Sequence, residues 1–150
     1  MDPVQRLLAE RACERLIVDF VHRLDLGEPA SVAELFTEDG SWEWPPPGDG
    51  RRVRGRAALG EYFGARPADR LSRRLMSGIL VTVVSAETAT AISYFSTHRV
   101  DGCTGGGLVP AGPPVQVGHY EDTFRRTGDR WLPASRVLRL AFGGPTPSVR

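Results

Sequence analysis

Acid/base chemistry in this chain would depend first on a histidine and a carboxylate. His98 ends the stretch ISYFSTH, and Asp25 stands near the end of a helical pattern at the N-terminus. On a strand, alternate side chains point to opposite faces, so Tyr94, Ser96 and His98 share one face. An imidazole exchanges protons near neutral pH, and a carboxylate can fix its tautomer. This mixed face predicts either a pocket wall with a working histidine or an ordinary strand edge.

The other two histidines are weaker candidates. His22 lies three residues before Asp25, so the two could present side chains together on a helix, but no clear third metal ligand accompanies them. We therefore predict no metal site and keep one built on His22, Asp25 and a distant ligand as an alternative. His119 alternates with Tyr120, so if Tyr120 faces a pocket then His119 faces away, and the opposite phase stays open.

Composition narrows the function further. The 19 basic residues are all arginine, which excludes lysine Schiff-base chemistry, a P-loop lysine and pyridoxal phosphate attachment. The net charge of +1 favours neither nucleic acid nor an anionic membrane as a partner. The 2 cysteines lie far apart and indicate neither zinc nor a disulfide framework. We predict no cofactor. With no apolar run long enough to span a membrane and no signal pattern, the expected location is the cytoplasm.

Helical patterns come first along the chain and strand patterns follow. Within the strand-rich part, "SAET" and "RTGDR" indicate hairpin turns between strands, and the Gly- and Pro-rich segment 101–114 indicates a surface loop, potentially a lid. The predicted helices are Pro3–Leu24, Ala30–Phe36 with Ser31 as a cap, and Arg56–Phe63, and the predicted strands are Ser41–Trp44, Leu75–Val84, Thr88–Val100, Val115–Arg126 and Trp131–Leu140.

This order predicts an α+β fold, with N-terminal helices packed on a conical, curved antiparallel sheet. At 150 residues the chain is the size of one domain, which we place at 1–142, followed by a flexible tail over 143–150. A long helix laid across a curved sheet leaves a hollow at its open end, where a small ligand would bind.

Four phrases carry a resemblance to a known family: "LDLGEPASVAELFTEDGSWEW", "VRGRAALGEYF", "TATAISYFSTHRVDG" and "GHYEDTFRRTGDRWLPASRVLRL". Together they resemble the SnoaL-like branch of the nuclear transport factor 2-like superfamily, from about residue 10 to 140. The resemblance implies a cone with a deep, mostly apolar pocket. Members include polyketide cyclases, scytalone dehydratase and ketosteroid isomerase, as well as proteins that only bind or assemble.

The scytalone dehydratase-like pattern implies roles for particular residues. Its pocket aspartate matches Asp25, its strand histidine matches His98, and the aromatic residue at the end of its first strand matches Trp44. Its second pocket histidine falls here on Arg74, which binds oxyanions or carboxylates but cannot shuttle protons. The predicted catalytic residues are Asp25 and His98, and the predicted substrate-binding residues are Trp44, Tyr62, Arg74, Tyr94 and Tyr120.

The leading hypothesis is a cofactor-independent dehydratase, isomerase or cyclase acting on a small, apolar, oxygenated metabolite, such as a polyketide, aromatic or terpenoid intermediate of secondary metabolism. His98 would move the proton, and Asp25 would orient the His98 imidazole. Tyr94, Tyr120 or Arg74 would stabilise the developing enolate or oxyanion. The alternative is a non-catalytic protein that binds a hydrophobic ligand or serves in assembly. The resemblance also implies a homodimer formed through the outer face of the sheet.

Overall fold

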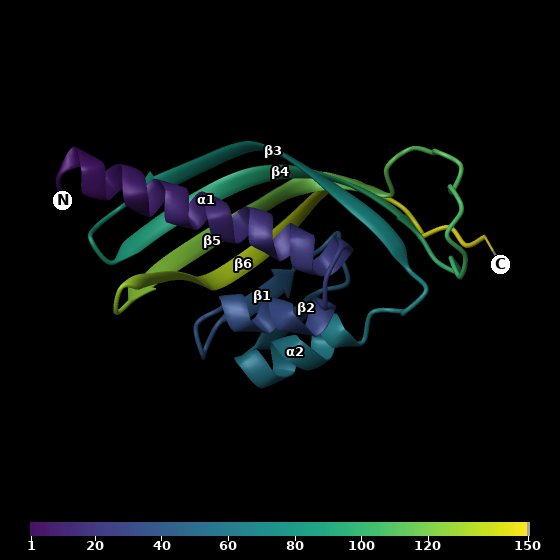
Figure 1. The fold of residues 1–150 in the computed structure, drawn as a ribbon, viewed down its shortest axis with the longest axis horizontal. Coiled ribbons are helices and arrows are strands. Elements are labelled where there is room, and N and C mark those ends of the chain that lie inside the picture. Colours follow the sequence, from purple (N-terminus) through teal and green to yellow (C-terminus); the bar gives the residue numbers. More distant parts are fainter. Residues whose placement is uncertain (150) are drawn as a thin grey trace.

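The computed structural model describes residues 1–149, and they form helices packed against one curved sheet (Figure 1). The helices are α1 (Pro3–Asp25), the 3-10 helix η1 (Pro29–Leu35) and α2 (Arg56–Gly64), and the strands are β1 (Ser41–Trp44), β2 (Arg51–Arg54), β3 (Leu71–Val83), β4 (Thr88–Val100), β5 (Gln116–Thr127) and β6 (Arg130–Gly143).

Helix α1 begins at a capped first turn and buries one face along its length. Asp2 accepts a hydrogen bond from the Gln5 backbone N–H at 2.8 Å, while the Gln5 side chain accepts one from the Asp2 backbone N–H, which completes a capping box. Pro3 occupies the first turn, where its missing N–H costs nothing. The buried side chains recur on one face of the helix, and they are Ala9, Cys13, Ile17, Phe20, Val21 and Leu24.

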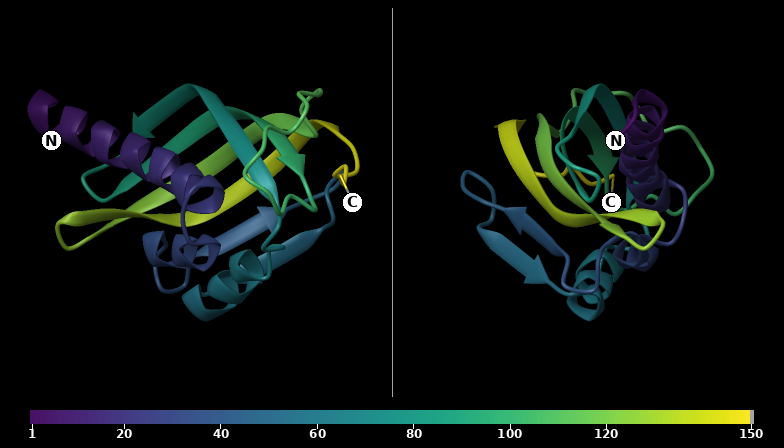
Figure 2. Two further views of the ribbon diagram at one scale, coloured as in Figure 1. Left: turned by 45° about the vertical axis from the view of Figure 1, so that its right-hand side comes forward. Right: turned by 90° about the vertical axis from the view of Figure 1, so that its left-hand side faces the viewer.

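The six strands form a single sheet in the order β2-β1-β6-β5-β4-β3. Strands β3 to β6 follow one another as antiparallel neighbours, as the hairpin turns predict. Strand β1 pairs with β6 in parallel, so the sheet is mixed rather than wholly antiparallel. Figure 2 shows that the long strands curl and that β1, β2 and α2 lie together below them in both views. The predicted α+β cone is confirmed.

Strand β2 was not predicted. Its four residues, RRVR, include three arginines and lack the alternating apolar pattern of a half-buried strand. It exists because β1 supplies an antiparallel partner, with Trp42 opposite Val53. Only Val53 among these four residues is partly buried. Pairing by tertiary contact therefore overrides a local sequence that indicates a turn.

The larger core cluster is aromatic and lies between α1, β1, α2 and the sheet. Phe20 stacks on Trp42 with ring centroids 5.9 Å apart and meets Phe63 edge-on at 5.6 Å. Tyr120 is 6.2 Å from Phe20 and 4.6 Å from Phe95. Such offset and edge-to-face pairs add to the stabilisation from area burial. Because these rings come from five elements, they fix the mutual positions of the elements that surround the hollow.

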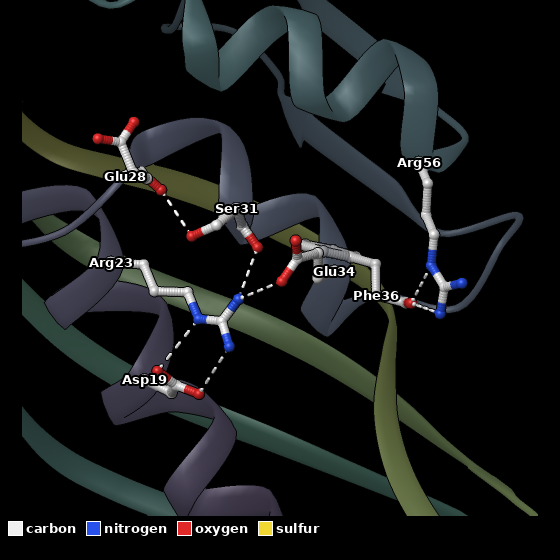
Figure 3. A network of polar contacts seen from close by, with 7 residues as sticks. All are labelled: Asp19, Arg23, Glu28, Ser31, Glu34, Phe36 and Arg56. Atoms are coloured by element: carbon white, nitrogen blue, oxygen red, sulfur yellow. Dashed lines mark hydrogen bonds and ion pairs between the residues drawn. The ribbon is translucent and has the colours of Figure 1, made fainter.

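Polar contacts hold η1 and α2 in place beside the cone (Figure 3). Arg23 of α1 donates to Asp19 at 3.2 Å, to the backbone oxygen of Ser31 at 2.8 Å and to Glu34 at 3.1 Å. The Ser31 hydroxyl donates to the backbone oxygen of Glu28, and no side chain caps η1, so the predicted Ser31 cap is wrong. These contacts tie η1 to the last turns of α1.

A second arginine attaches the start of α2 to the end of η1. The guanidinium of Arg56 donates twice to the backbone oxygen of Phe36, at 2.9 and 2.7 Å (Figure 3). This fork occupies a carbonyl that would otherwise lack a helical partner at the end of η1. Helix α2 is thereby held so that one of its sides faces the hollow.

The C-terminal tail runs beside the end of β4. The backbone N–H of Asp101 donates to Pro147 at 3.0 Å, and that of Val149 donates to Asp101 at 3.2 Å. The expected flexibility of this tail, like the single-domain boundary at 142, stays a prediction. Within residues 1–149 no helix is both long and apolar enough to cross a membrane.

Candidate functional site

A cavity of about 720 Å³ opens between α2, the β1–β2 hairpin and the inner face of the sheet. Its volume falls in the range of small-molecule sites. One side is apolar and aromatic, and another is strongly cationic. The lining residues on the apolar side include Leu24, Trp42, Trp44, Tyr62, Phe63, Tyr120 and Leu138, and the charged residues are Asp49, Arg51, Glu61, Arg66, Arg70, Arg74 and Arg99.

The aromatic side presents flat faces with polar edges. Trp42 and Tyr62 lie 6.3 Å apart between centroids, and Trp42 and Tyr120 lie 6.1 Å apart. Burial raises the pKa of the Tyr62 phenol, so it stays protonated at neutral pH and can donate a hydrogen bond. The predicted pocket residues Trp44, Tyr62 and Tyr120 all line this cavity. Their roles in binding stay predictions.

Asp25 is almost fully enclosed, and three donors surround its carboxylate. The backbone N–H of Arg74, the Arg74 guanidinium and the Ser72 hydroxyl each donate to it at 2.6 Å. The exposed fractions of the Asp25 and Arg74 side chains are 4% and 10%. The expected contact between Asp25 and His98 is wrong, because Arg74 and Ser72 occupy the carboxylate oxygens. Three of the roughly four acceptor sites of this carboxylate are thus occupied, and Asp25 is not part of the cavity lining.

His98 lies on the other side of the sheet from the cavity. Along β4 the buried residues are Ala89, Ala91, Ser93, Phe95 and Thr97, while Tyr94 is 59% exposed and His98 is half-buried. The predicted strand phase is therefore wrong by one residue, and such a shift moves every side chain of a strand to the opposite face. Tyr94 likewise lies outside the cavity, where its ring covers Gly78. Whether either residue takes part in function stays a prediction.

A second cavity, of about 770 Å³, contains His98. It lies beneath the loop of residues 101–114, with Pro110, Pro113 and Phe142 among its apolar lining. Arg73 lines it as well, on the opposite face of β3 from Arg74. Residues 109–114 of the loop that was predicted to be a lid therefore line this outer cavity, and its role as a lid stays a prediction.

The sequence interpretation missed most of the cationic side of the first cavity. Arg66 and Arg70 belong to "RPADRLSRR", from which only Arg74 was predicted to bind a ligand, and Arg99 was not predicted either. One signal was available, because on β3 Ser72 and Arg74 share a face that Arg73 does not. Arg99 shares the inner face of β4 with Phe95 and is registered opposite Ser72.

Two of these arginines have lowered pKa values. Burial, and secondarily the neighbouring Arg74, lowers the pKa of Arg66 to about 10. Burial, and secondarily Arg70, lowers the pKa of Arg99 to about 10. Both remain cationic at neutral pH, but their charge is poorly solvated and lies among like charges.

The remaining histidines stay outside the first cavity. His22 is exposed on α1, and His119 is half-buried and 3.9 Å from Glu121. Tyr120 faces inward, so the predicted phase of β5 is correct. Across residues 1–149, no cluster of three or more His, Cys, Asp or Glu side chains could hold a metal ion.

The deepest charges lie beneath the cavity wall. Asp122 and Arg136 form a buried pair at 2.7 and 3.1 Å, with side chains 2% and 3% exposed. The Arg136 guanidinium stacks on the Tyr120 ring, 3.9 Å from its centroid. This cation holds Tyr120 from behind, so the phenol ring that lines the cavity is rigidly placed.

This cone, with its aromatic cavity enclosed by helices and a curved sheet, defines a fold found in known proteins. Residues 5–137 match the family model of the SnoaL-like domain, so the chain belongs to the SnoaL-like domain family. The superfamily named from the sequence is confirmed.

Solved structures show the same fold. Rv3472 from Mycobacterium tuberculosis, a protein of unknown function, is 27% identical, with a TM-score of 0.73, and the match covers 93% of this chain and 76% of that one. An NTF2-like protein with a cystatin-like fold from Novosphingobium aromaticivorans is also 27% identical, with a TM-score of 0.72 and coverage of 93% and 86%. The hexachlorocyclohexane dehydrochlorinase LinA-type3 from Novosphingobium barchaimii is 15% identical, with a TM-score of 0.72 and coverage of 96% and 94%. No curated protein sequence matches the chain.

Proposed function

We propose that this SnoaL-like protein binds a small, largely apolar, oxygenated metabolite in its aromatic cavity. One observation carries the proposal: a cavity of about 720 Å³ walled by Trp42, Tyr62 and Tyr120, with no histidine in its lining. Flat rings give an aromatic or terpenoid body a large contact area, and the protonated phenol of Tyr62 can donate to a ligand oxygen. The pairing of Asp25 with Arg74 favours binding over the histidine–aspartate mechanism expected from the sequence.

Calorimetric titration with the neutral probe 1-naphthylmethanol, combined with two-dimensional NMR of the three indole N–H groups, tests this proposal. Trp42 and Trp44 line the cavity, whereas Trp131 lies in the other core cluster, so only the first two resonances should shift. Ala58 lines the cavity, and its exposed neighbour Ala57 does not. Ala58→Phe should weaken binding at least tenfold and Ala57→Phe should leave it unchanged. A probe that perturbs Trp131 alone, or binding indifferent to Ala58→Phe, would rule the site out.

Catalysis is the second candidate, and a different carboxylate favours it. Glu61 lines the cavity beside Tyr62 on α2, and within residues 1–149 its carboxylate forms no ion pair. Glu61 could accept a proton while Tyr62 and the arginines stabilise an enolate or oxyanion, as dehydration, isomerisation and cyclisation require. Glu61→Gln should then reduce kcat at least 100-fold with intact ligand binding, whereas Glu34→Gln on η1 should not. Full turnover by Glu61→Gln would reject this assignment.

A homodimer is a further part of the proposal. The outer face of the sheet exposes apolar side chains, including Leu75, Leu80, Ile92 and Tyr94, at 59%, 65%, 47% and 59%. Covering such a face with a second copy would remove apolar area from water. Sedimentation should give a dimer that dissociates in Leu80→Glu and Ile92→Glu. A monomer at all concentrations would contradict this pairing.

A further inference from the structure

Four arginines gather on one side of the aromatic cavity: Arg66, Arg70, Arg74 and Arg99. Two of them have carboxylate partners. Arg70 forms a two-pronged pair with Asp101 at 2.6 and 3.0 Å, and Arg74 pairs with Asp25 at 2.6 Å. In these two pairs the carboxylate neutralises the charge of the arginine and fixes the position of its side chain in the cavity wall.

The other two arginines contact hydroxyl groups. Arg66 donates to the Ser72 hydroxyl, and Arg99 donates to Thr146 at 2.9 Å. Within residues 1–149 neither guanidinium forms an ion pair with a carboxylate. A guanidinium carries five N–H donors, so one hydroxyl leaves most of its hydrogen-bonding capacity unused.

This arrangement is electrostatically costly in the absence of a ligand. Both side chains are half-buried, and the charges of Arg70 and Arg74 lie close enough to lower their pKa values. By contrast, the buried Arg136 is matched by Asp122, and the enclosed Arg74 is matched by Asp25. Arg70, Arg74 and Arg136 each pair with a carboxylate, whereas within residues 1–149 Arg66 and Arg99 have only the more distant charges of Asp25 and Asp101 to offset theirs.

We propose that Arg66 and Arg99 form an anion subsite that binds the carboxylate or phosphate of an aromatic or apolar acid. Five arginines line the cavity, and four carboxylates, Asp25, Asp49, Glu61 and Asp101, line it or pair with these arginines, so one positive charge is in excess and favours an anionic ligand. The apolar body of the ligand would then lie against Trp42 and Tyr62. The inference rests on the proposed function, because it assigns the ligand class of that same cavity.

Three naphthalene probes of similar size test the subsite by calorimetry: 1-naphthoate, 1-naphthyl phosphate and the neutral 1-naphthylmethanol. Wild-type protein should bind both anions at least tenfold more tightly than the alcohol. Arg66→Gln and Arg99→Gln should each weaken binding of the anions tenfold or more and leave the alcohol within about twofold. Comparison of the two anions distinguishes a carboxylate ligand from a phosphate ligand.

Arg73→Gln is the matched control, because Arg73 lies on β3 next to Arg74, with its side chain on the opposite face, at the second cavity. It should leave all three affinities unchanged. Equal binding of the alcohol and the anions, or a loss in Arg73→Gln equal to that in Arg66→Gln, would overturn the subsite. If no probe binds, the proposed function fails, whereas binding of the alcohol alone refutes only the subsite.

A measurement on wild-type protein avoids any dependence on the folding of variants. Affinity for 1-naphthoate should fall as salt is raised from 0.05 to 0.5 M, since ions screen the guanidinium charges, and affinity for the alcohol should not fall. Parallel behaviour of the two probes would count against the inference.

Discussion

Replacing Asp25 with asparagine separates a structural role from a catalytic one. The carboxylate accepts three short hydrogen bonds, from the Ser72 hydroxyl and from the backbone and side chain of Arg74. An asparagine keeps one acceptor oxygen, turns an NH₂ group towards donors and leaves the Arg74 guanidinium, which is 10% exposed, without its counter-charge.

The cost follows from the burial of that pair. Removing one partner of a buried ion pair costs about 3–5 kcal/mol, whereas an exposed pair is worth about 0–1 kcal/mol. For a domain of this size, about 3–5 kcal/mol corresponds to a fall in Tm of about 6–20 °C. Asp19→Asn is the matched control on the same helix, because its pair with Arg23 is partly exposed, at 35% and 27%. It should cost about 1 kcal/mol or less.

Urea unfolding followed by circular dichroism measures these differences. A cycle with Arg74→Gln completes the test, since the double variant should be less destabilised than the sum of the single variants. A loss below about 1 kcal/mol in Asp25→Asn, together with abolished turnover of a substrate, would refute the structural role and restore Asp25 as a catalytic residue.

Two further predictions concern groups away from the cavity surface. Burial raises the pKa of the Cys13 thiol to about 12, so at pH 8 a thiol reagent should label Cys103 alone in the folded protein and both cysteines in urea. The unfolded thiol ionises near pH 9 and the folded one does not, so the free energy of unfolding should fall above pH 9, by about 1.4 kcal/mol at pH 10. Cys13→Ala should remove this pH dependence, and an unchanged pH dependence in that variant would contradict the burial argument. Arg136→Met should cost about 3–5 kcal/mol at pH 7, because it leaves a buried carboxylate unpaired. Burial raises the pKa of Asp122, so that variant should regain stability as the pH falls below 7 and Asp122 takes up a proton, and a loss independent of pH would show that another group carries the cost.

Local patterns in the sequence predict most of the fold. The helical spacing at the N-terminus, the proline and glycine that follow it, and the four strand patterns place most elements within a few residues of the observed bounds. These signals are local because capping, turn formation and apolar periodicity involve residues close in the chain. The extension of β3 to Leu71 is different, since its first residues pair with the end of β4.

The composition of the site could be predicted only in part. Trp44, Tyr62, Arg74 and Tyr120 were identified and do line the cavity, and the resemblance carried the positions of Trp44 and Arg74. The grouping of Arg66 with Arg99 could not be predicted, since the two lie far apart in sequence and come near each other only because Arg66 contacts Ser72 of β3, which pairs with Arg99 of β4. The partner of Asp25 also changed from His98 to Arg74, because the phase of β4 decides which side chains can reach the carboxylate.

By itself, the sequence determined the α+β class, the SnoaL-like family, the aromatic character of the pocket and the absence of lysine chemistry. The tertiary structure decided which face of β4 points inward. Both faces of ISYFSTH are mixed, so apolar alternation does not choose between them, and Phe95 takes the inside because its ring packs 4.6 Å from that of Tyr120. With this phase of β4, His98 lines only the outer cavity, whereas Arg99 lines the aromatic cavity as well as the outer one, so an arginine stands where proton transfer by a histidine was predicted.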